Sequence, residues 1–451
     1  MKRRDFIKST SGATGVLAAA PYVLASEGWK GANDRVNVAV VGIHGMGQYH
    51  VTAFHELDSV RVAALCDVDE SLFEERVQKL YRDPGLPAPK IYTDLRRLYE
   101  DKDVDAVSIV TPNHWHTLAA IWAAQAGKHV TVEKPCCHTF HEGQKLVEAA
   151  ARYDVVVQDG AEQRSNPCAQ TMKSFLEGGG LGDVYLARGL CYKWRDTIGT
   201  TSDEPVPPGV HYDLWMGPAP KKPFSKNRFH YNWHWQWDYG NGDMGNQGVH
   251  EVDMARFGLG VGLPTRVSAM GGHFMFDDDQ ETPNTLTATW EFDETSRGGT
   301  KKMMQFEVRH WITDRGGLEV KTEKEEHAYM TSDANTIGNL YYGSKGYIAK
   351  DVHQWQAFMG QEKEPGETGR GEGNHFQNFV DAIRAGDKSL VTSTAEDGFL
   401  SCALIHLANI SYRLGRTIDF DPVAMEVVGD DQAGAMLTKE YRAPYTLPER
   451  L

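Results

Sequence analysis

The sequence predicts an α/β protein built in two halves. A doubly wound parallel sheet comes first, and an α+β half with a large open, mostly antiparallel sheet follows. Strand-like runs alternate with helical runs as far as residue 160, which is typical of a parallel sheet. From residue 161 onward strand-like segments predominate, separated by loops rich in proline and glycine. The 451 residues are enough for two or three domains with a sizeable core.

The composition excludes some classes of partner. The formal net charge is −15 at pH 7, which argues against a nucleic-acid-binding surface and against binding to an anionic membrane. The six cysteines show no metal-ligand spacing, so we expect no metal and mostly buried, free thiols. The 18 Tyr, 17 Phe and 11 Trp residues could serve a carbohydrate or nucleotide site, although core packing could use all of them.

The N-terminus has the pattern of a targeting segment. Residues 1–8 read MKRRDFIK, with the twin arginines Arg3 and Arg4, and a mildly apolar stretch follows over residues 12–24. This stretch is too short and too rich in small residues to be a membrane span. Residues 1–25 resemble a twin-arginine export signal, a route that carries folded proteins. We therefore expect a periplasmic or other extracytoplasmic location.

The first half begins with a glycine turn between a strand and a helix. Residues 35–41 form a strand, residues 42–47 read GIHGMG, and a second strand at 60–65 leads to Asp67. In such a unit the turn and the helix N-terminus bind a pyrophosphate, and the acid binds a ribose hydroxyl. Asp67 would repel a 2′-phosphate, which favours NAD, although NADP is not excluded. The usual spacing has glycine where this chain has His44, and Gly45 can restore the close approach.

Two more strand–helix units complete the predicted parallel sheet. A strand at 105–110 ends in Thr111-Pro112-Asn113-His114, and a helix is expected at 116–126. His114 and His116 could be metal ligands, but no third ligand has a recognisable spacing, so we expect the turn to line the cofactor crevice.

A strand at 130–132 ends at Glu133, Lys134 and Pro135, and proline stops the ladder. In open α/β sheets the ligand crevice lies at the carboxyl ends of the strands, which places Lys134 over a cofactor. A surface lysine paired with Glu133 is the alternative. A helix at 139–153 and a strand at 155–158 follow.

The second half is rich in predicted strands. A helix is expected at 167–176, and a further helix near residue 380 ends at Gly386. A long helix is expected at 394–414. The predicted strands lie at 184–192, 265–270, 285–292, 303–312 and 328–331.

An aromatic and polar cluster lies at residues 231–253. Trp233, Trp235 and Trp237 would share one face of an extended segment, and such a face suits the apolar side of a sugar; a core strand is the alternative. Asn246 and His250 are four residues apart, so one helix would place them on one face. A histidine beside a polar group can take a hydroxyl proton while nicotinamide takes the hydride.

Together these motifs resemble the Gfo/Idh/MocA family of oxidoreductases over residues 35–416. The motifs that carry the resemblance are Glu133-Lys134-Pro135, Thr111-Pro112-Asn113-His114 and Gly248-Val249-His250. The resemblance implies that Lys134 contacts nicotinamide and substrate and that His250 is the acid/base. The family's aspartate position holds Asn246, which can orient a hydroxyl but cannot share a proton. The resemblance also implies a sugar or polyol substrate and a homodimer or homotetramer built through the open sheet.

These expectations define the domains and sites. We expect a signal at 1–25, a Rossmann domain at 35–160, a substrate-binding and oligomerisation domain at 161–416 and a tail at 417–451. The catalytic residues are Lys134, His250 and Asn246, and no metal is expected. The cofactor residues are Gly42, His44, Gly45, Met46, Gly47, Asp67, Thr111, Pro112, Asn113, His116, Glu133, Lys134 and Gln163. The substrate residues are Arg164, Trp233, Trp235, Trp237, Asn246 and His250.

Export limits the reaction. Outside the cytoplasm little free NAD is expected, so the protein must hold its cofactor and return the hydride in each cycle. Coupled oxidoreduction of two sugars satisfies this condition. Transient oxidation of a glycoside, followed by elimination and re-reduction, also satisfies it, and some members of the family are glycosidases of that kind. A non-catalytic carbohydrate- or nucleotide-binding protein, favoured by His44 and Asn246, is the third possibility.

Overall fold

The structure is a computed structural model that describes residues 35–296, 298–299, 301–311, 313–314, 316–317, 331–332 and 335–451. The predicted export signal lies outside the described residues, and so do the end of the strand predicted at 303–312 and most of the one predicted at 328–331. No helix among the described residues is long and apolar enough to cross a bilayer.

A parallel sheet of six strands forms the first half, in the order β3-β2-β1-β4-β5-β6. Every neighbouring pair of these strands runs parallel, which confirms the doubly wound sheet. The order reverses between β1 and β4, and ligands of open α/β sheets bind at such a switch point. The strands are β1 (Val36–Val41), β2 (Val60–Cys66), β3 (Lys90–Tyr92), β4 (Ala106–Ile109), β5 (His129–Val132) and β6 (Val157–Asp159).

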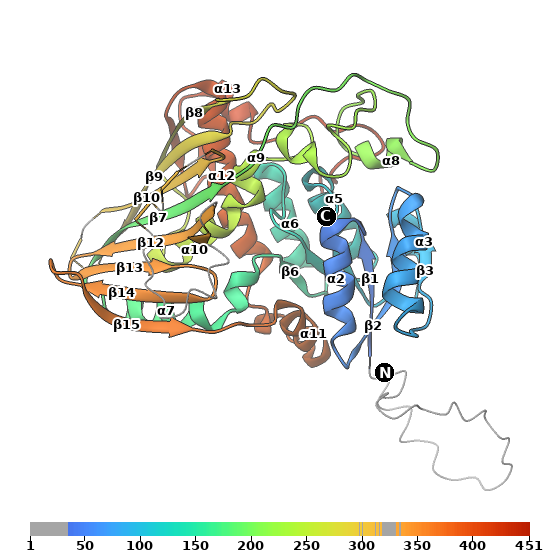
Figure 1. Cartoon of the computed structure of the whole chain (residues 1–451), viewed down its shortest axis with the longest axis horizontal. Helices are drawn as coiled ribbons and strands as arrows, with labels where there is room; N and C mark the ends of the chain where they lie inside the picture. Colours follow the sequence, from blue (N-terminus) through green and yellow to red (C-terminus); the bar gives the residue numbers. More distant parts are fainter. Residues whose placement is uncertain are drawn as a thin grey trace, which may run out of the picture. The chain divides into compact units, whose positions relative to one another are not determined.

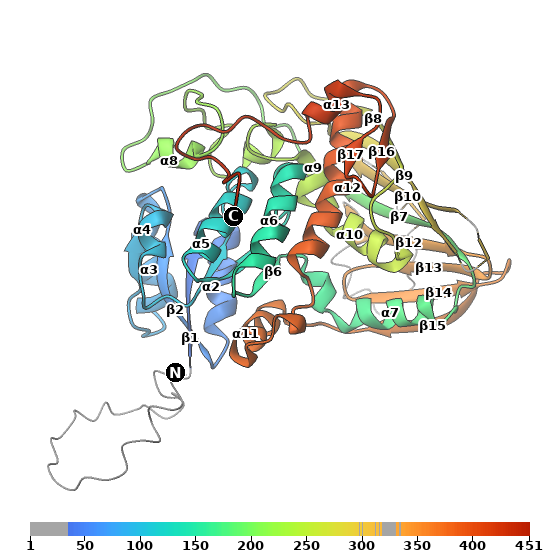
Figure 2. The same cartoon turned by 180° about the vertical axis from the view of Figure 1, so that it is seen from behind.

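Helices cover both faces of this sheet (Figures 1 and 2). Val38 and Val40 of β1 belong to the core that includes α2 and α11, whereas Ala39 and Val41 belong to the core that includes α5 and α6. Alternate residues of a strand point to opposite faces, so both sets are buried. The helices of this half are α2 (Gly45–His55), α3 (Ser71–Val77) with the π-helical turn η2 (Gln78–Arg82), α4 (Leu95–Tyr99), α5 (Asn113–Gln125) and α6 (Phe140–Arg152).

Helix α5 begins three residues before the position predicted from the sequence. Pro112 has φ of −59° immediately before Asn113, and proline suits the first positions of a helix because those N–H groups have no partner within the helix. The Thr-Pro-Asn-His motif is therefore the start of a helix at the end of β4, and the His114 amide donates to the Tyr239 carbonyl (3.2 Å).

The second half contains an eleven-stranded sheet in the order β15-β14-β13-β12-β7-β10-β9-β8-β16-β17, with β11 beside β12. Its pairs are antiparallel except for β7 with β10, which confirms a mostly antiparallel sheet. The strands are β7 (Val184–Lys193), β8 (Arg266–Gly272), β9 (Thr285–Thr295), β10 (Lys301–Arg309), β11 (Thr331–Ser332), β12 (Asn335–Gly343), β13 (Gly346–Lys350), β14 (Gln354–Met359), β15 (Glu364–Arg370), β16 (Ile418–Asp421) and β17 (Glu426–Val427).

Helices α10 (Gly248–Leu259) and α12 (Ala395–Leu414) cover one face of this large sheet, and α12 also packs on α6 of the first half (Figures 1 and 2). α12 therefore joins the two halves. A capping box between Thr394 and Asp397 begins this helix, and Gly415 in the left-handed conformation ends it. The remaining helices are η3 (Glu162–Ser165), α7 (Pro167–Glu177), α8 (Tyr212–Met216), η4 (Asn232–Trp235), α9 (Gly242–Asn246), α11 (His375–Ala385), η6 (Lys388–Leu390) and α13 (Asp431–Ala435).

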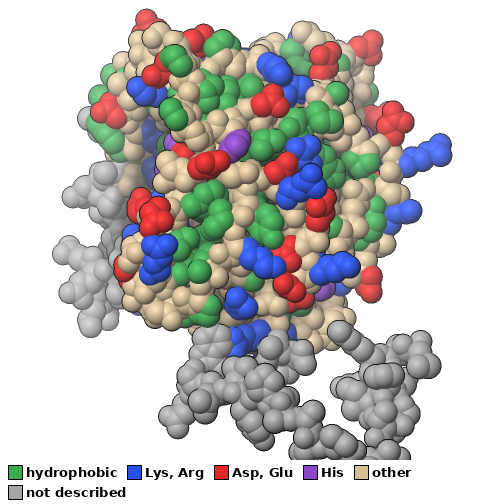
Figure 3. Space-filling view, turned by 90° about the vertical axis from the view of Figure 1, so that its right-hand side faces the viewer, with side chains coloured by type: hydrophobic (Ala, Val, Ile, Leu, Met, Phe, Trp, Pro, Cys, Tyr) green, Lys and Arg blue, Asp and Glu red, His purple; other side chains and the backbone are tan. Residues whose placement is uncertain are grey.

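The surface on the side of α3 and β3 carries both signs of charge, interspersed rather than gathered into one patch (Figure 3). Lys90 on the edge strand β3 pairs with Asp101 and Asp103, and Arg82 pairs with Glu74. A charged edge of this kind discourages pairing with another chain.

Buried histidines are expected to make the fold sensitive to acid. His375 lies at the start of α11 against Ser165 Oγ (2.7 Å) and the Asp159 carbonyl (2.9 Å), and burial lowers its pKa to about 4. An unfolded chain protonates histidine near pH 6.5, so the contribution of His375 to stability is complete above that pH and is lost toward pH 4. We expect His375→Gln to flatten the pH dependence of the free energy of unfolding by about 1.4 kcal/mol per pH unit between about pH 6 and 4.5.

Denaturant titrations of both proteins across this range measure the difference. His211→Gln, at an exposed ring, is the control and should leave the slope unchanged. Equal slopes for the wild type and His375→Gln would contradict the assignment.

Candidate active site

A cavity of about 400 Å³ lies at the carboxyl ends of β1, β2, β4 and β5. The glycine turn, the start of α5 and the end of β5 form its floor, and residues 214–234 with Tyr445 form the opposite wall. The lining residues predicted from the sequence are Gly42, His44, Gly45, Met46, Gly47, Asp67, Thr111, Pro112, Asn113, His116, Glu133, Lys134, Trp233 and Asn246. The structure thus brings most of the predicted cofactor residues together.

The glycine turn has the room that a pyrophosphate requires. Gly42 has φ of +86°, and a Cβ on Gly47 would lie 1.8 Å from the Gly42 carbonyl oxygen, so both positions need glycine. A Cβ on Gly45 would have no neighbour within 4 Å, so the backbone there faces open space. The His44 ring stacks on His230, with centroids 4.6 Å apart. The first amides of α2 therefore suit an anion.

Asp67 lies where an adenosine ribose would be bound. One carboxylate oxygen accepts from the Ile43 amide (2.7 Å) and the other from the Asp69 amide (3.0 Å). Burial raises the pKa of Asp67 to about 6, and the two amides oppose that shift. Asp94 lines the same cavity, and Lys134 is the only lysine or arginine among the described lining residues. This donor set fits the two ribose hydroxyls of NAD better than a 2′-phosphate.

The turn after β4 is tied to the turn after β5 through His116. Its ring lies 2.6 Å from the Thr111 carbonyl oxygen and 2.8 Å from the Pro135 carbonyl oxygen. His114 is fully buried, and its ring contacts the Trp215 carbonyl (2.9 Å). Both histidines are thus held by carbonyl oxygens, and His116 fixes the relative position of the two turns that line the cavity.

Lys134 extends from the end of β5, and its Nζ donates to the main-chain carbonyl of Asn246 (2.7 Å). Glu133 accepts from the Lys134 amide (3.1 Å) and pairs with His50 (3.0 Å). Burial alone would raise the pKa of Glu133, but His50 and the charge of Lys134 lower it to about 2. Glu133 is therefore an anion that orients the backbone at Lys134, and the side chain of Lys134 is directed across the cavity rather than paired with Glu133.

Asn246 and His250 are not on one continuous helix. Helix α9 ends at Asn246 and α10 begins at Gly248, so the helical conformation is interrupted at Gln247. The Asn246 amide donates to Asp243 (3.3 Å), and Arg195 and His310 (2.7 Å) also bind this buried carboxylate. A carboxylate thus lies directly behind the position where the family pattern has aspartate.

Two histidines lie in the electrostatic field of Lys134. Desolvation and then the charge of Lys134 lower the pKa of His250 to about 3. Desolvation and the same charge lower the pKa of His234 to about 3, although the Tyr231 carbonyl opposes this shift. Both rings are therefore neutral near pH 7 and able to accept a proton. No residue in the described part of the chain hydrogen-bonds the His250 ring, whereas His234 Nδ1 contacts the Tyr231 carbonyl (2.5 Å).

The three predicted indoles do not share a face. Residues 232–235 form the 3₁₀ helix η4. Such a helix has three residues per turn, so two residues that are two apart, and would share one face of a strand, point in different directions. Trp233 lines the cavity, Trp235 packs on Arg195 (4.9 Å to the ring centroid), and Trp237 lines a second cavity under Arg413. The expectation of an extended aromatic face was wrong.

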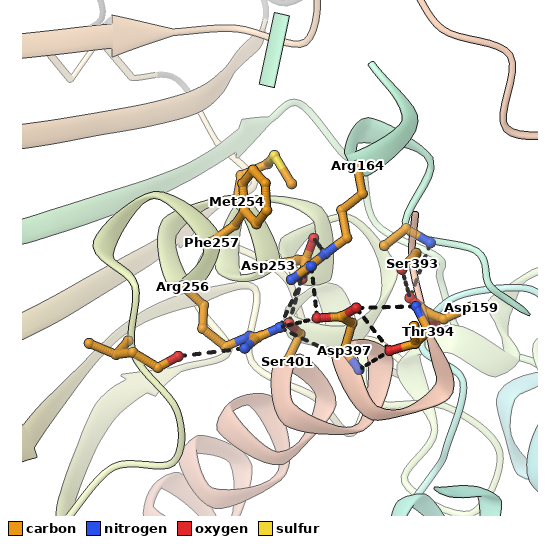
Figure 4. Close-up of polar contacts among 12 residues, drawn as sticks. Asp159, Arg164, Asp253, Met254, Arg256, Phe257, Ser393, Thr394, Asp397 and Ser401 are labelled. Atoms are coloured by element: carbon orange, nitrogen blue, oxygen red, sulfur yellow. Dashed lines mark hydrogen bonds and ion pairs between the residues drawn. The ribbon is translucent and has the colours of Figure 1, made fainter. Parts of the chain in front are cut away.

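Gln163 and Arg164 lie away from the lining of the cavity. Gln163 accepts from Lys350 (2.7 Å). Arg164 holds Asp253 through two nitrogens and Asp397 through a third (2.8 Å), in the network drawn in Figure 4. Burial alone would raise the pKa of Asp253, but the charge of Arg164 keeps it below its usual value. Both side chains are thus bound to protein groups outside the lining of the cavity.

Other lining residues were not predicted as site residues. His230 and His234 lie in the stretch around the three tryptophans, so their neighbourhood could have suggested them. Tyr445 comes from the tail, where no sequence pattern identifies it. The remaining unpredicted residues include Thr93, Asp94, Leu95, Leu214, Trp215, Phe229 and Tyr231.

Known proteins resemble this chain in part. It is 37% identical over 123 residues to a "glycosyl hydrolase family 109 protein" of Shewanella pealeana, covering 26% of this chain and 27% of the relative. It is 27% identical over 177 residues to a myo-inositol 2-dehydrogenase of Thermotoga maritima, covering 39% and 48%. The chain thus spans about a quarter and about half of these curated relatives.

A solved structure of levoglucosan dehydrogenase, in complex with NADH and levoglucosan, shares the fold. It has a TM-score of 0.62 and 20% identity, and the match covers 85% of this chain and 99% of that one. A model described as "oxidoreductase family, NAD-binding Rossmann fold" matches residues 36–161, and one described as "oxidoreductase family, C-terminal alpha/beta domain" matches residues 170–447. Together the two matches cover most of the chain, which therefore belongs to the Gfo/Idh/MocA oxidoreductase family.

Proposed function

We propose that the protein oxidises a hydroxyl-bearing carbon of a sugar, polyol or glycoside, with NAD as hydride acceptor. The position of Lys134 carries this proposal. Lys134 follows the end of β5 and lines the same cavity as the glycine turn. Its Nζ donates to the Asn246 carbonyl, just before the helix that holds His250. The inositol dehydrogenase and the levoglucosan complex among the similar proteins support a carbohydrate substrate.

Each residue has a distinct task in this proposal. NAD supplies the hydride acceptor when it is bound. The α2 amides hold the pyrophosphate, and Asp67 holds the ribose hydroxyls. Lys134 donates a hydrogen bond to the substrate oxygen, and neutral His250 takes the hydroxyl proton. His234 is also neutral and, unlike His250, lies in the lining of the cavity, so it is the competing proton acceptor.

We further propose that the protein is exported by the twin-arginine route and keeps its cofactor through successive cycles. Residues 206–239, the cover segment, lie along the cavity opposite the glycine turn. Backbone hydrogen bonds from His211 to Val68 (2.8 Å) and from Glu70 to Gly209 (3.0 Å) join this segment to the first half. Arg442 of the tail donates to the Gly217 carbonyl (2.8 Å). A cover held at both sides favours slow release of the cofactor.

A redox glycosidase is the second candidate, favoured by the similarity to the family 109 glycosyl hydrolase. In that reaction, oxidation of one sugar carbon acidifies the neighbouring C–H. Loss of that proton expels the glycosidic substituent, water adds to the double bond, and return of the hydride restores the alcohol. The same groups around Lys134 would serve both reactions.

We also propose a homodimer or homotetramer built through the large sheet, as the family resemblance implies. Met270 of β8 is 81% exposed and Met275, just after β8, is 66% exposed, which supports an apolar contact between subunits beside this strand.

The first test is to look for nicotinamide in the purified, exported protein by absorbance and mass spectrometry. We expect about one NAD per chain and turnover of sugars without added cofactor. Nitrophenyl glycosides in D₂O separate the two reactions, since deuterium enters beside the oxidised carbon only when elimination occurs. A protein that binds NAD but turns over neither class would be a binding protein, and the proposed activity would be wrong.

Lys134→Met is expected to lower turnover by more than about 100-fold, because both substrate positioning and charge stabilisation are lost. NADH binding and the melting temperature should remain close to wild type. Lys79→Met, an exposed lysine of η2, is the matched control. Comparing the turnover of His250→Gln with that of His234→Gln identifies the proton acceptor. A Lys134→Met variant with wild-type turnover would contradict the proposed mechanism.

Asp67→Ser is expected to reduce the preference for NAD over NADP by more than about tenfold, because a charged hydrogen bond to the ribose contributes about 1.5–3 kcal/mol. Fluorescence titration with NADH and NADPH measures the ratio. Asp94→Asn is the control, since Arg96 already pairs with that carboxylate (2.6 Å) and a smaller change follows. An unchanged ratio in Asp67→Ser would place the ribose elsewhere.

The acid limb of kcat/KM is expected below about pH 5 rather than near the usual histidine value of about 6.5. A base works while it is unprotonated, and the pKa of His250 is lowered to about 3 by desolvation and by Lys134. NMR titration of the His250 ring gives a direct measurement. In Lys134→Met the pKa of His250 should rise. An unchanged pKa would mean that the charge of Lys134 does not act on His250.

A further inference from the structure

Three thiols from distant parts of the chain meet beside the loop that carries Lys134. Cys136 and Cys137 follow Pro135, and Cys402 lies in α12. Their sulfur atoms all lie within 4.8 Å of one another, and those of Cys136 and Cys402 are 3.9 Å apart. His406, one turn further along α12, places its Nε2 3.5 Å from Cys137 Sγ. The thiols are at most 1% exposed and the histidine is 4% exposed.

We propose that Cys136, Cys137, Cys402 and His406 bind a zinc ion. Zinc in structural sites is tetrahedral, with Zn–S near 2.3 Å and Zn–N near 2.0–2.1 Å. The edges of such a tetrahedron are about 3.8 Å between sulfurs and about 3.5 Å between sulfur and nitrogen. The Cys136–Cys402 distance of 3.9 Å and the Cys137–His406 distance of 3.5 Å match two of the six edges, and the three sulfurs all lie within 4.8 Å of one another. Three cysteines and one histidine are an established zinc ligand set.

A disulfide is a poorer explanation of the same cluster. A disulfide has its sulfurs about 2.05 Å apart, so Cys136 and Cys402 would need to move together by almost 2 Å within a packed core. Such a bond would also leave Cys137 and His406 facing each other without a role. A zinc ion would use the three thiols where they stand, with His406, beside Cys137, as the fourth ligand.

The surroundings offer access and compensating charge. His406 lines a second cavity of about 280 Å³ together with Arg413 and Lys439. The cavity thus reaches the cluster at His406 and at none of the three thiols. Three thiolates and one Zn²⁺ carry a net charge of −1. Arg413 and Lys439 lie in the same lining, and Lys439 already pairs with Glu142 (2.8 Å), which leaves Arg413 as the compensating cation. The site departs from the expectation of no metal, because Cys402 lies 266 residues from Cys136 and sequence spacing cannot connect them.

The proposed ion would connect the two halves at a sensitive place. Cys136 is two residues after Lys134, and α12 packs on both α6 and the large sheet. Zinc would therefore fix the loop that positions Lys134 against the helix that joins the halves. This role is structural, and it does not depend on the substrate or on the proposed reaction.

The test uses the full chain purified from cells grown with zinc and kept reduced. We expect about one zinc per chain by elemental analysis, and Co²⁺ exchange should give the visible absorption of a tetrahedral cobalt–thiolate site. His406→Gln should weaken zinc binding by more than about tenfold in competition with a chromogenic chelator. Cys402→Ser should abolish zinc binding and lower the melting temperature.

Cys168→Ala is the matched control, because this buried thiol lies outside the cluster and should leave the zinc content unchanged. His406→Gln remains informative if Cys402→Ser does not fold. A reduced, folded protein that takes up neither Zn²⁺ nor Co²⁺ would overturn the proposal. A Cys136–Cys402 disulfide found by mass spectrometry in the reduced preparation would overturn it as well.

Discussion

One buried guanidinium ties the chain that leaves the parallel sheet to the two helices that cover the large sheet. Arg164 follows the last strand of the parallel sheet, and it binds Asp253 of α10 and Asp397 of α12 at once. Arg164 and Asp253 are buried, so removing either partner would leave an uncompensated charge at a cost of about 3–5 kcal/mol. The network thus holds α10, which carries His250, against α12, which packs beside the turn after β5.

The first half could be predicted closely because its signals are local. The glycine turn, Asp67 and the Lys134 turn each lie at the end of a strand, and parallel strands bring their carboxyl ends to one edge. The floor of the cavity therefore follows from strand order, whereas its opposite wall does not. The start of α5 was misplaced by three residues, since Pro112 was interpreted as part of a turn rather than as the residue before a helix.

The rest could not be predicted because it depends on contacts between distant segments. The alternation of Trp233, Trp235 and Trp237 fits a strand, yet the 3₁₀ helix η4 holds Trp233 and Trp235 and ends before Trp237, so the three indoles lie in different surroundings. The strands β12–β15 went unpredicted. The tail contributes β16, which pairs with β8, and Tyr445, which lines the cavity. The cysteine cluster likewise appears only once α12 packs beside the turn after Pro135.

The departure at Asn246 has a physical explanation in Asp243. This carboxylate is buried, and Arg195 and His310 hold its pKa well below the usual value even though burial opposes them. An aspartate at 246 would place a second, partly buried carboxylate at the 3.3 Å contact that Asn246 now makes with Asp243, and two carboxylates that close disfavour ionisation of both. The amide of Asn246 instead donates to Asp243. The negative charge thus lies on Asp243, behind Asn246 rather than at position 246 itself, and it orients the Asn246 amide. Lys134 and a neutral histidine remain as the groups that can contact a substrate hydroxyl.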